Sequence, residues 1–199
     1  MTLPTVEIRW FAAGTLPVDI ASWFESTSPL SARIEDRTDR YLRPADPATN
    51  IKIREGRLEI KRRIWIDTGF EDCPMIAGTI EAWNKCGFDI DTSAEAHTDA
   101  NWISCRKRRA TKWFSWGFGG LVPLSGPESA ASACQLEMSS LTIMQQHWWT
   151  VGFEATGTNS RDLLEKTTRS LMAGFPMVEP ELLMPMGYAE WLRSCFPDG

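Results

Sequence analysis

The chain has little of what zinc sites and disulfide frameworks are built from. It contains two histidines, His97 and His147, and five cysteines that are widely spaced and form no Cys-x-x-Cys pair. An odd number of isolated cysteines predicts reduced, mostly structural thiols, and two distant histidines support no zinc site. The sequence therefore supports neither a zinc site nor a disulfide framework.

Long hydrophobic runs and an overall basic charge are also missing. No stretch approaches the roughly 20 apolar residues of a membrane-spanning helix, and the first residues lack a basic segment followed by an apolar run. The formal net charge of -5 disfavours a general nucleic-acid binder, which is usually basic overall. We expect a cytoplasmic protein of one domain over residues 1–199, with no membrane or nucleic-acid partner.

What the chain does have is local clusters of basic residues in strand-like stretches. In residues 51–64, Lys52 and Arg54 alternate with isoleucines, Glu55-Gly56 offers a turn, and Lys61 and Arg63 continue the alternation. This pattern predicts a β-hairpin with one apolar and one cationic face. A cationic strand face that is merely solvated is the simplest interpretation of this hairpin alone.

The alternation recurs elsewhere, which favours a shared charged surface. Arg106 and Arg108 share one face of a strand-like stretch, with Lys107 and Arg109 on the other. Carboxylates appear on further strand-like stretches, at Glu7, Glu137 and Glu154. Cations suit phosphate oxygens, and carboxylates suit a metal ion that accompanies a phosphate chain. We therefore predict a β-barrel with a charged interior into which Arg106 and Arg108 point.

The rest of the chain predicts an α+β protein that is mainly β. Further strands are expected at residues 5–12, 31–42, 102–116, 132–144 and 147–155, and helices at 18–26, 158–174 and 188–194. Residues 117–127 are expected to form a loop, residues 69–100 stay open between helix and strand, and the acidic residues between 89 and 99 suit a solvated loop better than a calcium site. The ten tryptophans are best explained by packing.

The order of these parts resembles the CYTH superfamily, the triphosphate tunnel metalloenzymes. The stretches that carry the resemblance are Thr5-Val-Glu7-Ile-Arg9, Asp39-Arg-Tyr41, Ile51-Lys-Ile-Arg54, Leu58-Glu-Ile-Lys61, Arg106-Lys-Arg108, Glu137, Glu154 and Gly187-Tyr-Ala-Glu-Trp-Leu. The resemblance implies an eight-stranded antiparallel barrel, or tunnel, with helices outside. It also implies basic residues that grip a triphosphate and glutamates that hold Mg2+ or Mn2+.

Carried over to this chain, the resemblance assigns three kinds of role. The catalytic positions are Glu7, Arg9 and Lys61. The triphosphate-binding positions are Lys52, Arg54, Lys61, Arg63, Arg106 and Arg108. The metal positions are Glu7, Glu137 and Glu154. The implied partner is a small molecule that contains a triphosphate, and the sequence leaves a monomer and a homodimer equally open.

The first strand departs from the family's Glu-x-Glu-x-Lys pattern. Thr5 stands where the family has a first glutamate, Arg9 replaces its lysine, and Gln135 stands where another acid would help. A missing carboxylate weakens metal binding, and an always-protonated arginine cannot handle a proton as a lysine can. A metal-dependent triphosphatase is therefore the first hypothesis. A non-catalytic polyphosphate or nucleotide-binding barrel and a lipocalin-like barrel for an apolar ligand are the alternatives.

Overall fold

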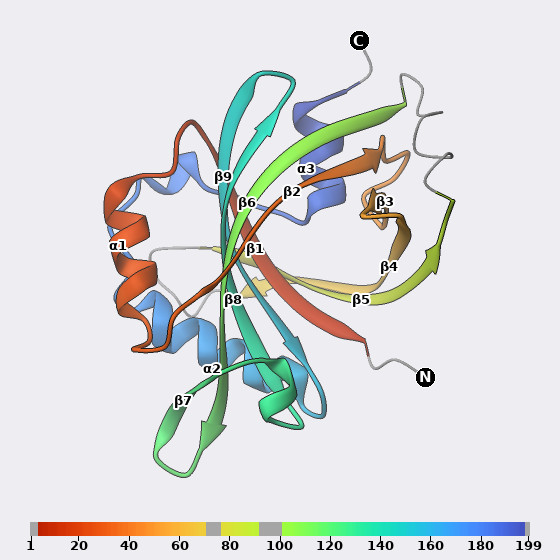
Figure 1. Cartoon of the computed structure of the whole chain (residues 1–199). Helices are drawn as coiled ribbons and strands as arrows, with labels where there is room; N and C mark the ends of the chain where they lie inside the picture. Colours follow the sequence, from red (N-terminus) through yellow and green to blue (C-terminus); the bar gives the residue numbers. More distant parts are fainter. Residues whose placement is uncertain (1–3, 71–76, 92–100, 198–199) are drawn as a thin grey trace.

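The computed structural model describes residues 4–70, 77–91 and 101–197 and folds them around one β-sheet (Figure 1). Its strands are β1 (Thr5–Ala13), β2 (Arg33–Leu42), β3 (Thr49–Arg54), β4 (Arg57–Phe70), β5 (Gly78–Asp89), β6 (Trp102–Gly117), β7 (Gly120–Leu124), β8 (Ala133–Ile143), β9 (Gln146–Thr156) and β10 (Met184–Pro185). The helices are α1 (Val18–Ser26), α2 (Ser160–Met172) and α3 (Tyr188–Cys195), with short 3-10 turns at Pro127–Ser129 and Pro180–Leu182.

Eight strands close into an antiparallel barrel. Their order is β1-β5-β4-β3-β2-β6-β8-β9, and β9 pairs back with β1 through a register that includes Glu7 opposite Glu154. The predicted class, mainly β with an eight-stranded antiparallel barrel and helices, is confirmed. Two short strands lie off this ring, because β7 pairs with β6 and β10 pairs with β1.

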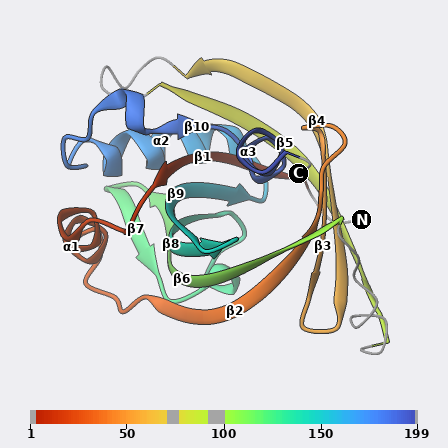
Figure 2. The ribbon, with the colours of Figure 1, turned by 90° about the horizontal axis from the view of Figure 1, so that it is seen from above.

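The outer face of the barrel carries the larger apolar core. On β1, Val6, Ile8 and Trp10 face outward and alternate with the inward Glu7 and Arg9, as the two-residue period of a strand requires. The outward residues pack with side chains of α1 and α2, among them Ile20, Trp23, Phe24, Leu163 and Leu164. Figure 2 shows α1 outside the strands, and Figure 1 shows α1 and α2 on the side of β1 away from α3. The helices thus cover the apolar face and leave the polar face inside.

One end of the barrel interior is filled by a second apolar cluster around α3. Phe11 follows Glu7 and Arg9 on the inner face of β1, and Trp191 of α3 stacks on it with ring centroids 4.4 Å apart. Tyr188 stacks on Tyr41 of β2 at 5.6 Å. The predicted tunnel is therefore closed at the α3 end, and its charged part opens at the other end.

Residues 78–89, which the sequence left open between helix and strand, form the strand β5. The loop predicted at 117–127 is wrong in part, because residues 120–124 form β7, which makes a hairpin with β6. Glu95, His97 and Asp99 lie outside the described residues. Among the helices that the structure describes, none is long and apolar enough to cross a membrane. Compartment and partners remain predictions.

Candidate functional site

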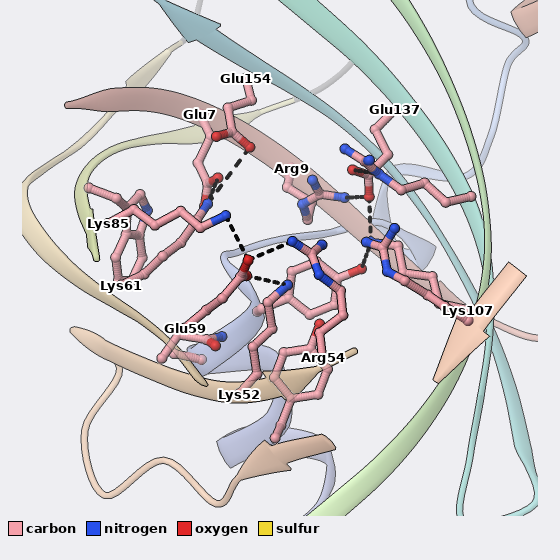
Figure 3. Close-up of a pocket in the computed structure, with 17 residues that line it drawn as sticks. Glu7, Arg9, Lys52, Arg54, Glu59, Lys61, Lys85, Lys107, Glu137 and Glu154 are labelled. Carbon is pink, nitrogen blue, oxygen red and sulfur yellow. Dashed lines mark hydrogen bonds and ion pairs between the residues drawn. The ribbon is translucent and has the colours of Figure 1, made fainter. Parts of the chain in front are cut away.

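The open part of the barrel encloses a charged cavity, here called the charged chamber (Figure 3). Its volume is about 100 Å³. The cationic lining residues are Arg9, Arg37, Lys52, Arg54, Lys61, Lys85, Lys107 and Arg109, and the acidic ones are Glu7, Glu59, Glu137 and Glu154. Tyr41, Asn50, Trp83, Tyr188 and Ala189 complete the lining.

The chamber is positive although the whole chain is acidic. Eight formal positive charges face four carboxylates in the lining. Two further carboxylates lie beside it, Asp39 next to Lys52 and Glu35 next to Arg109, and they reduce the formal excess from four to two. The chain as a whole carries a formal charge of -5. Positive charge is therefore concentrated inside the barrel.

Most of the residues singled out in the sequence meet in this chamber. Those that line it are Glu7, Arg9, Lys52, Arg54, Lys61, Glu137 and Glu154. Arg63 is not among the lining residues, because it is turned to Glu81, to which its Nη1 donates a hydrogen bond of 2.6 Å. Arg63 therefore does not face the chamber in which its predicted contact with a phosphate would lie.

The prediction for Arg106 and Arg108 is wrong, because both are exposed on the outside of β6. The Arg106 side chain is 71% exposed and pairs with Asp36 at 3.2 Å. Ile103 and Cys105 belong to the inner apolar cluster, so the alternation of the strand turns Lys107 and Arg109 inward. The sequence is cationic on both faces here, and only the apolar residues at 103 and 105 reveal which face is internal.

Glu137 is the centre of one group of charges. It accepts hydrogen bonds from Arg9 at 3.0 Å, from Lys107 at 2.7 Å and from Arg109 at 2.7 Å. Burial alone would raise its pKa, but Arg109, Arg9 and Lys107 outweigh this effect and hold the pKa well below its usual range. Both carboxylate oxygens of Glu137 are thus engaged by cations.

A glycine makes the room for this group. Gly152 lies opposite both Arg9 on β1 and Glu137 on β8. A Cβ at this position would come within 2.8 Å of the Arg9 guanidinium carbon. The absent side chain therefore lets Arg9 reach across β9 to Glu137.

Lys61 is the centre of a second group, formed with Glu7 and Glu154. Its Nζ donates to Glu7 Oε2 at 2.8 Å and lies 3.7 Å from Glu154 Oε2. Burial would lower the pKa of Lys61, but Glu154 and Glu7 outweigh it and raise the pKa above its ordinary value. Lys61 is therefore a permanent cation between two carboxylates that face each other across β1 and β9.

Glu59 holds a third group on the β3–β4 side. It lies within 3.3 Å of Lys52, 2.5 Å of Arg54 and 3.1 Å of Lys85. Although burial opposes the change, Lys52, Lys85 and Arg54 lower the pKa of Glu59 to about 2. One carboxylate thus holds three cationic side chains at the open end, where an anion could take its place as their partner.

Lys107 differs from the other cations of the chamber. Its side chain is 4% exposed and its Nζ donates to Glu137 and, at 2.8 Å, to the Tyr188 hydroxyl. Burial lowers the pKa of Lys107 to about 7 even though Glu137 acts in the opposite direction. Its charge therefore responds to pH and to any anion that binds nearby.

The described residues contain no group of three acidic, histidine or cysteine side chains arranged to hold a metal ion. Glu137 is surrounded by cations, and Lys61 Nζ lies between Glu7 and Glu154, so these two carboxylates could hold a divalent ion only if it displaced Lys61. Mg2+ is often bound through one or two carboxylates together with phosphate oxygens of a substrate, so a phosphate would have to complete such a site.

Several lining residues were not assigned from the sequence. They are Arg37, Glu59, Lys85, Lys107, Arg109 and Tyr188. Glu59 shares a face of its strand with Lys61, which was predicted to face inward, so its alternation could have identified it. No residue of the strand that carries Arg37 was predicted to face inward. Lys85 required the strand β5 to be recognised, and Lys107 and Arg109 required the correct face of β6.

Comparison with known proteins adds no family assignment. No protein-family model matches the chain, and no curated protein matches it in sequence.

Proposed function

We propose that the barrel binds the triphosphate group of a small molecule in the charged chamber and hydrolyses it with Mg2+ or Mn2+. The observation that carries this proposal is the concentration of cationic side chains inside a barrel of an acidic protein, at the open end of an otherwise closed interior. Such a site attracts a compact polyanion and offers it charge-assisted hydrogen bonds. The proposal includes a CYTH-like origin for the chain.

The lining residues have different roles in this proposal. Lys52, Arg54 and Lys85 at the open end would take phosphate oxygens as partners in place of Glu59, and Arg9 and Lys107, which lie beside Tyr188 of α3, would receive the innermost phosphate. Catalysis of phosphoryl transfer rests mostly on positioning and on stabilising charge, which fixed cations supply. Glu7 and Glu154 would hold the divalent ion, which when bound neutralises phosphate charge and favours attack by water.

A lipocalin-like role is disfavoured by the same lining. An apolar ligand would have to displace water from twelve charged side chains without giving them new partners, and unpaired buried charges are costly. Trp10, Trp149 and Trp191 are not available to an apolar ligand either, because they pack in the two apolar clusters.

A second candidate is a barrel that binds the triphosphate without turnover. Two observations favour it: Thr5 occupies the place of a family carboxylate, and Lys61 already neutralises Glu7 and Glu154. The Thr5 hydroxyl is buried and has no hydrogen-bond partner among the described residues. Metal affinity would then be too low for chemistry, while anion binding would persist.

The experiment measures phosphate release from inorganic triphosphate and from ATP, with Mg2+ and with Mn2+. The hydrolase proposal predicts metal-dependent turnover that Glu154→Gln abolishes and that Glu128→Gln, at an exposed glutamate, leaves unchanged. Thr5→Glu should raise turnover at low metal concentration, whereas Thr5→Gln should not. Triphosphate binding with no turnover in either metal would support the non-catalytic candidate instead.

A further inference from the structure

Arg108 is a basic residue of β6 that has no part in the proposed function. It is exposed on the outside of the barrel, and no residue that the structure describes pairs with its guanidinium. Asp36 lies directly opposite Arg108 on β2, but Arg106 holds both oxygens of that carboxylate, through Nε at 3.3 Å and Nη2 at 3.2 Å. One carboxylate thus serves Arg106 and leaves Arg108 as an accessible cation.

A cavity of about 230 Å³ lies beside Arg108 and is called here the outer cavity. Its apolar wall is formed by Leu16, Ile34, Ala110 and Met138. Ala110 and Met138 belong to the larger apolar core, so this cavity lies on the face of the strands opposite to the charged chamber. Ile34 is 54% exposed, so apolar surface is open to solvent here and would be covered by a ligand.

A second polar group without a partner stands next to Arg108. Ser140 of β8 lies directly opposite Arg108 and also lines the outer cavity. Its hydroxyl makes no hydrogen bond within the part of the chain that the structure describes. A guanidinium offers N–H donors in a planar fork that suits a carboxylate, and a hydroxyl can donate one hydrogen bond more. Two free donors therefore meet at one side of an apolar cavity.

The other charged groups at the outer cavity already have partners. Glu25 Oε2 lies 3.6 Å from Lys112 Nζ. Arg109 turns its guanidinium into the barrel, where it donates to Glu137 at 2.7 Å and to Glu35 at 3.2 Å. The positive charge of Arg108 is therefore the one left without a counter-charge among the described lining residues, and a ligand with a single negative charge would balance it.

We propose that the outer cavity binds a small carboxylic acid with an apolar body. Arg108 and Ser140 hold the carboxylate, and the body lies against Ile34 and Met138. The volume of about 230 Å³ is below the roughly 300 Å³ of a common small-molecule pocket, which suits a short chain or a single ring. The site is separate from the charged chamber, because Arg108 points away from it, and it does not depend on the proposed function.

Three probe molecules separate the two halves of this site in an NMR titration of the whole chain. Octanoate has a carboxylate and an apolar body, acetate has no comparable body, and octanol has no charge. Octanoate should bind about tenfold or more tightly than either of the others, because only octanoate gains both the charge-assisted hydrogen bonds and the burial of apolar surface.

Three variants at exposed positions assign the contacts. Arg108→Gln should weaken octanoate about tenfold, since it removes the charge that balances the carboxylate. Ile34→Ser should weaken octanoate about threefold and change acetate less than twofold. The control is Arg57→Gln, which removes an exposed arginine of β4 that pairs with Asp89 at 2.9 Å, and it should change octanoate less than twofold.

Four results would overturn the proposal. They are no binding of octanoate by the wild type, binding no tighter than that of octanol, equal affinities of the wild type and Arg108→Gln, and a tenfold loss in Arg54→Gln, which would place octanoate in the charged chamber instead. None of these titrations contains a triphosphate, so the outer cavity and the proposed function stand or fall separately.

Discussion

Single residues decide how tightly charge can be packed inside this barrel. Gly152 allows Arg9 to reach Glu137, and Glu137 in turn holds Lys107 and Arg109. The sequence predicted Glu7, Arg9 and Glu137 as inward residues from the alternation of their strands. It could not predict that Glu137 binds cations instead of a metal, since that depends on which strands become neighbours across the barrel.

Gly152→Ala should destabilise the fold. The added Cβ would meet Arg9 at 2.8 Å, so the guanidinium must leave Glu137 or the strands must shift. We expect a loss of about 1–3 kcal/mol in the free energy of unfolding, measured by urea denaturation. Gly119→Ala is the control, because no atom lies within 4 Å of a Cβ there. An unchanged stability of Gly152→Ala would contradict the close contact.

The protonation of Lys107 should make triphosphate binding depend on pH. Burial holds its pKa at about 7, so above pH 7 the side chain is mostly neutral in the free protein. A bound polyanion raises this pKa, and binding at pH 8 should therefore take up a proton and weaken as the pH rises to 9. Calorimetry in two buffers of different ionisation enthalpy measures the uptake.

Two variants isolate the contribution of Lys107. Lys107→Met should lower the proton uptake at pH 8, whereas Lys61→Met should weaken binding and leave the uptake as it is, because Lys61 has a raised pKa and stays charged. Equal uptake by the wild type and Lys107→Met would show that Lys107 does not change its protonation on binding.

At the scale of elements, strand alternation was predictable but the inner face of β6 was not. The expected helix at 18–26 has the bounds that its amphipathic pattern indicated. The hairpin predicted at 51–64 forms but is longer, because β3 begins at Thr49 and β4 ends at Phe70. On β6, both faces carry cations, and the choice depends on the apolar cluster under α3. Lys112 lies on the outer face of β6 and is buried against the end of α1.

Lys112 fixes the end of α1 and should therefore matter for stability. Its Nζ donates to the carbonyl oxygens of Phe24 at 3.0 Å, Glu25 at 2.8 Å and Ser28 at 3.2 Å. Lys112→Met leaves these three carbonyl groups without that donor, and we expect the free energy of unfolding to fall by about 2 kcal/mol. Lys166→Met, which removes a surface ion pair with Asp162, should cost less than about 0.5 kcal/mol. Thermal and urea unfolding compare the two, and equal effects would refute the role of Lys112.

At the scale of the whole molecule, the chain separates apolar packing from charge. The outer face of the barrel meets α1 and α2 through an apolar core, and α3 closes one end of the interior with a second core. The charges that remain inside gather at the open end. The alternation of the strand-like stretches predicted a barrel with a charged interior, but the closed end follows from the packing of α3, which no alternation pattern reveals.

The central claim is that the charged chamber binds a triphosphate, and calorimetric titration with inorganic triphosphate tests it most directly. Arg54 and Arg106 form a matched pair, because each pairs with one carboxylate, Arg54 with Glu59 inside the barrel and Arg106 with Asp36 outside. We predict that the wild type binds, that Arg54→Ala weakens binding about tenfold or more, and that Arg106→Ala changes it less than twofold. No binding by the wild type, or equal losses in the two variants, would contradict the account.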